Sequence, residues 1–175
     1  MSTSREGVTL IGMPGAGKST VGVLLSKRLA LGFIDSDLLI QVREDKPLQK
    51  VLDDEGYLGL RAIEEAVLLT VEPRGNVIAT GGSAVYSDAA MRHLASGSCV
   101  VWLDVPLTEL RTRIRDYETR GISRRPDQDF SELFAERQAL YSRHSDLRID
   151  CSDGNQEDAL ERLLAALEVR RGGAS

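Results

Sequence analysis

The chain has few residues that could stabilise its fold through disulfide bonds or a bound metal ion. It contains only two cysteines and two histidines. Cys99 and Cys151 show no CxxC spacing, so we expect reduced thiols in a cytoplasmic protein. So few thiol and imidazole groups also argue against a zinc site. A chain of 175 residues buries about two-thirds of its unfolded surface, and it therefore needs no such stabilisation.

Long apolar runs and a strong excess of one charge are also missing. No stretch approaches the ~18 apolar residues of a membrane-spanning helix. The first apolar stretch, residues 8–11, is too short for the apolar part of a signal peptide. A net charge of −5 with a pI near 5.1 argues against a general electrostatic binder of nucleic acid or membranes. We expect neither partner, and we expect a monomer that acts on a small molecule.

Short apolar runs alternate with helical patterns along the whole chain. No linker or repeat interrupts it, so we expect one domain over residues 1–175. Strands are predicted at 8–11, 33–34, 77–79, 99–103 and 147–149. Helices are predicted at 18–30, 48–54, 60–71, 88–95, 107–115, 132–142 and 157–170. This alternation is typical of an α/β fold with a five-stranded parallel sheet flanked by helices. Ligands of such sheets bind beyond the carboxyl ends of the strands, here after Ile11, Ile34, Ala79 and Leu103.

The most specific motif follows the first strand. Residues 12–20 read GMPGAGKST and match G-x-x-x-x-G-K-[ST], the P-loop, between a predicted strand and a predicted helix. Its glycines let backbone N–H groups turn toward phosphate oxygens, and the helix start adds partial positive charge. Lys18 suits the β- and γ-phosphates, and the Ser19 hydroxyl suits Mg²⁺. We therefore expect ATP and Mg²⁺; the residues expected to hold them are Gly12, Gly15, Ala16, Gly17, Lys18, Ser19 and Thr20.

Two carboxylates follow the second strand. Asp35 and Asp37 lie two residues apart, so they share one face if the chain stays extended there. One could hold Mg²⁺ and the other could orient a substrate hydroxyl. A solvated turn is the alternative, because Asp and Ser favour turns.

Arginines and a second glycine turn are the remaining candidates. Arg61 precedes Glu64 and Glu65 on a predicted helix, as either a surface ion pair or a fork held by these acids and aimed at a substrate carboxylate. Gly81 and Gly82 end the third strand and predict a close approach of the backbone to a ligand or a strand. Six arginines then gather around Gly121 and predict a cationic lid over phosphates, with a solvated loop as the alternative: Arg111, Arg113, Arg115, Arg120, Arg124 and Arg125.

Taken together, residues 8–150 resemble the shikimate kinase family, small P-loop kinases with the nucleoside-monophosphate-kinase fold. The resemblance implies ATP-dependent phosphorylation of shikimate to shikimate 3-phosphate in aromatic amino acid biosynthesis. It implies a substrate-binding helical insert at about 36–66 and a lid at about 116–130.

The resemblance also implies roles for single residues. Lys18 and Ser19 would serve ATP and Mg²⁺, with Asp35 assisting the metal and Asp37 contacting substrate hydroxyls. The family's F-R-x-x-E element resembles residues 60–64, and its R-x-P-L-Y element resembles residues 137–141. Arg61 and Arg137 would therefore bind the substrate carboxylate.

The glycine turn and the lid follow the family pattern less closely. The family's G-G-G turn under the substrate matches Gly81 and Gly82, with Ser83 in place of the third glycine. The lid arginine that reaches the transferring phosphate corresponds to Arg125, with Arg124 as the alternative, and the arginine that stacks on adenine corresponds to Arg113.

Three departures from the family pattern keep other acceptors open. Ser83 replaces a glycine, Leu60 replaces a phenylalanine, and the lid is longer and reads RPDQ at residues 125–128. A kinase of another polyol, sugar acid or cyclitol is the first alternative. A nucleoside-monophosphate kinase and a nucleotide-dependent switch without a small substrate are the others.

Overall fold

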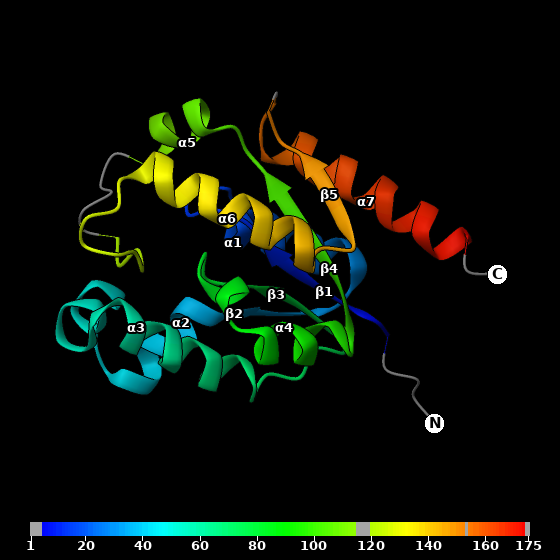
Figure 1. Cartoon of the computed structure of the whole chain (residues 1–175). Helices are drawn as coiled ribbons and strands as arrows, with labels where there is room; N and C mark the ends of the chain where they lie inside the picture. Colours follow the sequence, from blue (N-terminus) through cyan, green and yellow to red (C-terminus); the bar gives the residue numbers. More distant parts are fainter. Residues whose placement is uncertain (1–4, 115–119, 153, 174–175) are drawn as a thin grey trace.

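Five strands form one parallel sheet in the order β2-β3-β1-β4-β5 (Figure 1). The computed structural model describes residues 5–114, 120–152 and 154–173. The strands are β1 (Gly7–Ile11), β2 (Gly32–Asp35), β3 (Asn76–Ala79), β4 (Ser98–Asp104) and β5 (Leu147–Asp150). β1 and β4 are central and almost wholly buried, which explains their unbroken apolar sequence. The predicted strands and the α/β fold class are confirmed.

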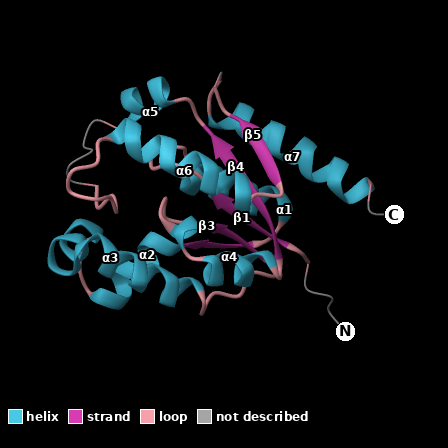
Figure 2. Cartoon of the chain, in the orientation of Figure 1, coloured by secondary structure: helices cyan, strands magenta, loops and turns pink. Residues whose placement is uncertain are grey.

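Helices cover both faces of the sheet (Figure 2). On one face, α1 (Lys18–Leu29) packs on β1, β2 and β3 and contacts α7 (Gln156–Gly172). On the other face, α4 (Asp88–Ala95) and α6 (Phe130–His144) pack on β4. Two short helices are α5 (Leu107–Arg113) and η1 (Ala84–Tyr86), and η1 contacts both α4 and α6. The result is three layers with the main hydrophobic core on either side of β1 and β4.

The segment between β2 and β3 carries its own small core. Two helices, α2 (Ser36–Glu44) and α3 (Leu48–Leu68), pack on each other. Their buried contact consists of Ile40, Val51, Leu60 and Val67. The sequence pattern did not predict α2, and it predicted two helices, at 48–54 and 60–71, where the structure has α3. The structure has one element that is interrupted at Gly56, where φ is 70° and ψ is 173°.

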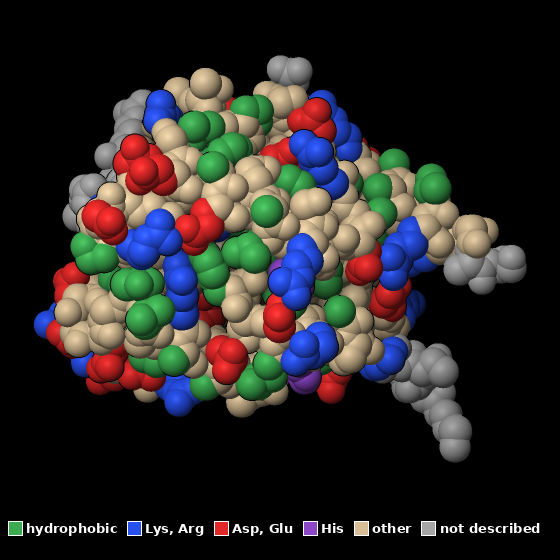
Figure 3. All heavy atoms as spheres, viewed as in Figure 1, with side chains coloured by type: hydrophobic (Ala, Val, Ile, Leu, Met, Phe, Trp, Pro, Cys, Tyr) green, Lys and Arg blue, Asp and Glu red, His purple; other side chains and the backbone are tan. Residues whose placement is uncertain are grey.

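The surface carries charges of both signs. Figure 3 shows Lys and Arg side chains interspersed with Asp and Glu over the visible face. An exposed pair such as Arg143 and Asp88, 3.3 Å apart, contributes little to stability because water screens it. Cys99 and Cys151 are buried free thiols. Within the part of the chain that the structure describes, no helix is long and apolar enough to span a bilayer.

Candidate active site

A cavity of about 630 Å³ opens at the carboxyl ends of the sheet strands. Its wall combines the P-loop, residues 80–83 after β3, parts of α2 and α3, residues 120–123, Arg137 on α6 and the start of α7. The segments after β1, β2 and β3 therefore supply residues that line the cavity, at the place where the sequence predicts a ligand. The end of β4 does not line the cavity; Leu103 instead places its carbonyl against Gly12.

The P-loop forms the phosphate end of this cavity. Gly15 and Gly17 adopt φ values of 82° and 90°, which only glycine adopts readily. Lys18 is buried, and its Nζ donates hydrogen bonds to the carbonyls of Gly12 and Met13 at 2.8 and 2.9 Å. Burial lowers the pKa of Lys18 to about 8. The loop therefore holds its cation close to the backbone that would surround a phosphate.

The other P-loop residues support this arrangement. The backbone N–H of Ala16 donates to the Met13 carbonyl at 3.1 Å and closes the loop. Ser19 and Thr20 are exposed on the first turn of α1 and line the cavity. Arg113, at the end of α5, also lines it and donates to the Gly15 carbonyl at 3.4 Å.

Asp35 and Asp37 take different positions. The expectation that both face one crevice required an extended chain, and it is wrong because α2 begins at Ser36. Asp35 caps this helix, accepting from the N–H of Asp37 at 3.0 Å, and its other oxygen accepts from the Ser19 hydroxyl at 2.6 Å. Asp37 lines the cavity, and burial raises its pKa, with the Asp35 charge adding to the effect. The two acids thus separate into one beside Ser19 and one beside the open space.

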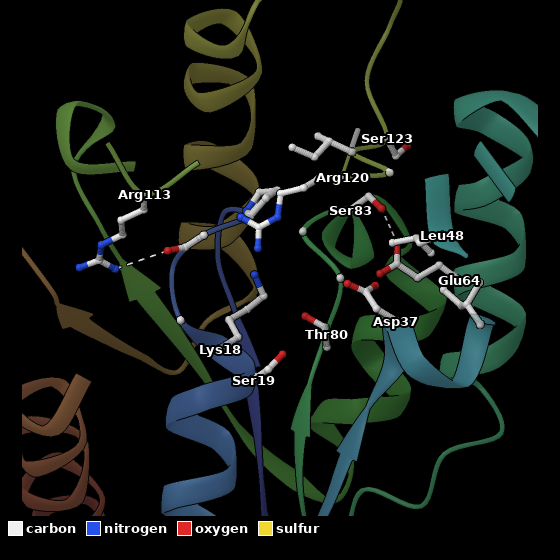
Figure 4. A pocket seen from close by; sticks show the side chains of 18 of the residues that line it. Lys18, Ser19, Asp37, Leu48, Glu64, Thr80, Ser83, Arg113, Arg120 and Ser123 are labelled. Carbon is white, nitrogen blue, oxygen red and sulfur yellow. Dashed lines mark hydrogen bonds between the residues drawn. The ribbon is translucent and has the colours of Figure 1, made fainter. Parts of the chain in front are cut away.

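Glu64 is a cavity residue that the sequence analysis did not place in the site. It is 3% exposed and accepts a short hydrogen bond from the Ser83 hydroxyl on Oε2, while Oε1 is buried without a partner (Figure 4). Burial raises its pKa to about 7, and the Asp37 charge contributes. Glu64 is the last residue of the segment that resembles F-R-x-x-E, but the sequence pattern suggested only that it pairs with Arg61.

The glycine turn lies against these acidic and basic groups. A Cβ at Gly81 would collide with Glu64 Oε1 and lie 2.8 Å from Asp37. A Cβ at Gly82 would lie 2.7 Å from Arg137 Nη1. Both glycines therefore permit a close approach of the backbone to charged side chains, whereas the sequence predicted an approach to a ligand or a strand.

Arg137 and Arg61 meet around Tyr86. Arg137 is 1% exposed, lines the cavity, and donates from Nη2 to the Ser123 carbonyl at 2.6 Å, while its Nε is buried without a partner. Arg61 donates from Nε to the Ser123 hydroxyl at 3.1 Å and stacks 3.5 Å from the Tyr86 ring centre. Arg61 is not among the lining residues. Neither of the two predicted arrangements, a surface ion pair or a fork held by Glu64 and Glu65, is found for Arg61, since these acids bind Ser83 and Ser87.

The arginines of the expected lid divide into inward and outward groups. Arg120 lines the cavity, its charge acts on Asp37, and Figure 4 shows its side chain directed into the cavity above Lys18. Arg125 does not line the cavity and forms an ion pair with Glu136 at 2.9 Å. Arg124 donates to the Gln128 carbonyl at 2.8 Å, and Arg111 binds Ser131. Arg115, like residues 116–119 of the expected lid, lies outside the described residues.

Further residues that the sequence did not single out also line the cavity. Thr80, Ser123, Asn155 and Gln156 line it from three separate segments. Thr80 directly follows a predicted strand, which was a usable signal. Asn155 caps α7 through its side chain, a common role that did not suggest a ligand.

The P-loop supplies a phosphate site, and the opposite end of the same cavity supplies a carboxylate and a buried guanidinium for a small polar molecule. A five-stranded parallel sheet with this site defines a P-loop phosphotransferase that acts on an alcohol.

The comparisons with known proteins identify the family. The family model for shikimate kinase matches residues 14–168. A shikimate kinase of Microcystis aeruginosa is 38% identical over 164 residues, which cover 91% of this chain and 85% of that protein. The chain belongs to the shikimate kinase family.

Solved structures agree. The shikimate kinase of Acinetobacter baumannii, in complex with shikimate, superposes with a TM-score of 0.85 at 26% identity and covers 95% of both chains. The shikimate kinase of Aquifex aeolicus gives a TM-score of 0.79 at 31% identity, covering 94% of this chain and 97% of that one. A gluconokinase of Sinorhizobium meliloti, at 18% identity and a TM-score of 0.55, shares the fold.

Proposed function

We propose that this chain transfers the γ-phosphoryl group of ATP to the 3-hydroxyl of shikimate. One observation carries this proposal: a single cavity joins the P-loop lysine, Lys18, to the buried Arg137, whose Nε has no partner. Buried donors normally have partners, so this guanidinium is suited to an anionic ligand. Family membership supports shikimate as that ligand.

At the phosphate end, the backbone from Gly12 to Thr20 would surround the phosphates, and Lys18 would leave the Gly12 and Met13 carbonyls to bind them. Arg113 is proposed to stack on the adenine. Ser19 and Asp35 offer two adjacent hard oxygen ligands, a set that fits Mg²⁺ because this ion takes one or two protein oxygens together with phosphate and water. Mg²⁺ would neutralise phosphate charge there.

At the acid end, Arg137 and Arg61 would bind the substrate carboxylate. Burial and the charge of Arg137 lower the pKa of Arg61, so the two guanidinium groups share a region that favours an anion. Gly81, Gly82 and Ser83 would pass beneath the substrate ring.

Asp37 would accept a hydrogen bond from the 3-hydroxyl, orient its oxygen toward the γ-phosphorus and take its proton. The new O–P bond forms as the bond to the β-phosphate oxygen breaks and ADP leaves. Holding both reactants in line supplies most of the rate in phosphoryl transfer.

The arginine that neutralises charge on the transferred phosphoryl group is proposed to be Arg120, because it lines the cavity above Lys18. The family resemblance instead points to Arg125, which would have to leave Glu136 to reach the phosphates. Either residue would act from the proposed lid at 116–130.

The remaining proposals concern organisation. Residues 1–175 are proposed to form one kinase domain, with α2 and α3 within a substrate-binding insert at 36–66. The active form is proposed to be a monomer. The two free thiols agree with a cytoplasmic protein.

The test is an acceptor panel with purified protein, ATP and Mg²⁺. Shikimate, gluconate, a cyclitol and nucleoside monophosphates are each assayed for ADP release, and the product is examined by mass spectrometry and phosphorus NMR. We expect shikimate to be the preferred acceptor and the product to carry its phosphate on the 3-hydroxyl. Preference for another acceptor, or ATP hydrolysis without a phosphorylated product, would overturn the proposal.

A further inference from the structure

The backbone at Ser83 accommodates a side chain, and the Ser83 hydroxyl forms a hydrogen bond with Glu64. Its φ of −96° and ψ of −1° suit any L-residue, so the turn does not require glycine here. The hydroxyl does not cap the following helix η1. It donates instead to Oε2 of Glu64, a bond that links the turn after β3 to the insert helix α3 inside the cavity wall (Figure 4).

This bond decides which Glu64 oxygen faces the site. With Oε2 held by Ser83, Oε1 lies against Gly81 on the side of Asp37, buried and without a partner. An unpaired buried acceptor is costly unless a ligand supplies a donor. Among the described residues that line the cavity, the buried side-chain atoms without a hydrogen-bond partner are a donor, Arg137 Nε, and an acceptor, Glu64 Oε1. A hydroxylated carboxylic acid supplies the complementary pair.

We infer that Ser83 is a positioning residue that holds Glu64 so that its free oxygen accepts a hydrogen bond from a hydroxyl of the acid substrate. This inference rests on the proposed function and deepens it. Ser83 need not touch the substrate; it acts through Glu64 on the hydroxylated side of the ligand, while Arg137 and Arg61 hold the carboxylate.

The charge of Glu64 gives the inference a pH signature. Burial and the nearby Asp37 charge raise the pKa of Glu64, whereas the Ser83 hydroxyl, Arg137 and Lys18 lower it to leave it near 7. Because the ionised form is the better acceptor, substrate affinity should fall as pH drops through this range. Removing the Ser83 hydroxyl raises the pKa of Glu64 further, so the fall should begin at higher pH.

The chain offers a matched control. Ser87 donates to Glu65 in the same way, one residue further along α3, and neither residue lines the cavity. Glu65→Gln therefore alters an equivalent serine–glutamate pair outside the site. Ser87 itself is less suitable for substitution because its hydroxyl also caps α4.

The experiment measures shikimate affinity by calorimetry between about pH 5.5 and 8.5 for wild type, Ser83→Ala, Ser83→Gly and Glu65→Gln. At neutral pH, we expect both Ser83 variants to bind about 5- to 10-fold more weakly, with a midpoint up to about one pH unit higher. Their kcat should change less than about two-fold, since uniform binding is lost. Glu65→Gln should retain the wild-type affinity and midpoint.

A double-mutant cycle with Glu64→Gln separates positioning from a direct or purely structural role. Glu64→Gln should lose the pH midpoint, and Ser83→Ala should add no further loss in that background. Wild-type affinity and midpoint in both Ser83 variants would overturn the inference. So would a Ser83→Ala loss that persists in full beside Glu64→Gln.

Failure of the proposed function gives a different result. If wild type neither binds nor phosphorylates shikimate, the proposed substrate falls together with the ligand named here. The coupling of Ser83 to Glu64 is then read in the ligand-free protein by carbon NMR of labelled glutamate carboxyls. A higher Glu64 pKa in Ser83→Ala supports the coupling, and an unchanged pKa overturns it.

Discussion

The two ends of the cavity are built in different ways. The phosphate end is one continuous loop, in which Lys18 binds carbonyls five and six residues away. The acid end takes Asp37 from α2, Glu64 from α3, Ser83 from the turn after β3, and Arg137 from α6. The comparison teaches that a site made by one local motif is fixed by that motif. A site made by several elements depends on how those elements pack.

This difference also appears in the unpaired atoms. Among the described residues, buried side-chain atoms without partners include Glu64 Oε1 and Arg137 Nε at the acid end, while Lys18 satisfies itself on its own loop. At the acid end, a bound ligand could therefore form hydrogen bonds with Glu64 Oε1 and Arg137 Nε. The phosphate end can exchange its internal bonds for phosphate.

Substitution of Lys18, at the phosphate end of the cavity, should have the largest effect on activity. Lys18→Ala removes the one buried cation of the P-loop, so we expect kcat to fall by about 10³-fold or more in an ADP-release assay. Lys50→Ala is the control, because Lys50 is exposed and bound to Asp54. Activity within ten-fold of wild type in Lys18→Ala would contradict this role.

Substitution of the two arginines tests the acid end. Arg137→Ala should raise the KM for shikimate by about 10²-fold, because a buried carboxylate would lose its main partner. Arg61→Ala should raise it by about ten-fold, since Arg61 lies behind Ser123 rather than on the cavity wall. The KM for ATP should change little in either variant, and Arg137→Lys checks for a folding defect. If neither arginine variant alters KM or kcat, the proposed binding of the substrate carboxylate by Arg137 and Arg61 is wrong.

Substitutions of Arg120 and Arg125 test which arginine of the proposed lid contacts the transferred phosphoryl group. Arg120→Ala should lower kcat by about 10- to 100-fold through loss of one charged hydrogen bond to the transferred phosphoryl group. Arg125→Ala should lower kcat less than about three-fold, because Arg125 is exposed and bound to Glu136. A larger effect at Arg125, measured in the same steady-state assay, would return the phosphate role to that residue.

The last prediction concerns stability rather than turnover. The pKa of Glu64 is raised from an ordinary 4.5 to about 7, so the folded state binds its proton more tightly than the unfolded state does. Its favourable contribution is complete below about pH 4.5 and is lost as pH rises through 7. The side chain at position 64 cannot ionise in the Glu64→Gln variant. The free energy of unfolding of this variant, relative to that of wild type, should therefore rise by about 2–3 kcal/mol between pH 5 and pH 8.

Urea unfolding at both pH values measures this difference. Titrating groups that do not interact with Glu64 cancel when the variant is compared with wild type at the same pH, whereas Asp37, whose charge acts on Glu64, does not cancel completely. A difference in the free energy of unfolding that stays constant from pH 5 to pH 8 would show that Glu64 does not titrate in this range.

Much of the fold was predictable because its signals are local. The apolar run of β4 and the helical spacing of α1 required no knowledge of distant residues. Two errors arose where local signals conflict: α2 begins immediately after β2 with no spacer, and Gly56 interrupts α3 without ending it. Packing of α2 on α3 around Ile40 and Val51 decided both cases.

The candidate site was predictable to a similar degree. The P-loop residues lie as its motif requires, and Arg137 reaches the cavity even though a lone arginine on a helix suggests a surface residue. The inward position of Arg120, the outward position of Arg125 and the bond between Ser83 and Glu64 had no local signal. Each depends on a partner between 11 and 83 residues away or on a shared cavity wall.

The sequence by itself determined the parallel sheet and the phosphate-binding loop, because strand burial, helix periodicity and glycine geometry act within a few residues. Only the tertiary structure decided which arginines and acids meet at the other end. Their positions follow from the packing of α2, α3, α6 and the turn after β3 on one sheet edge, and burial there sets both their charges and their unpaired atoms.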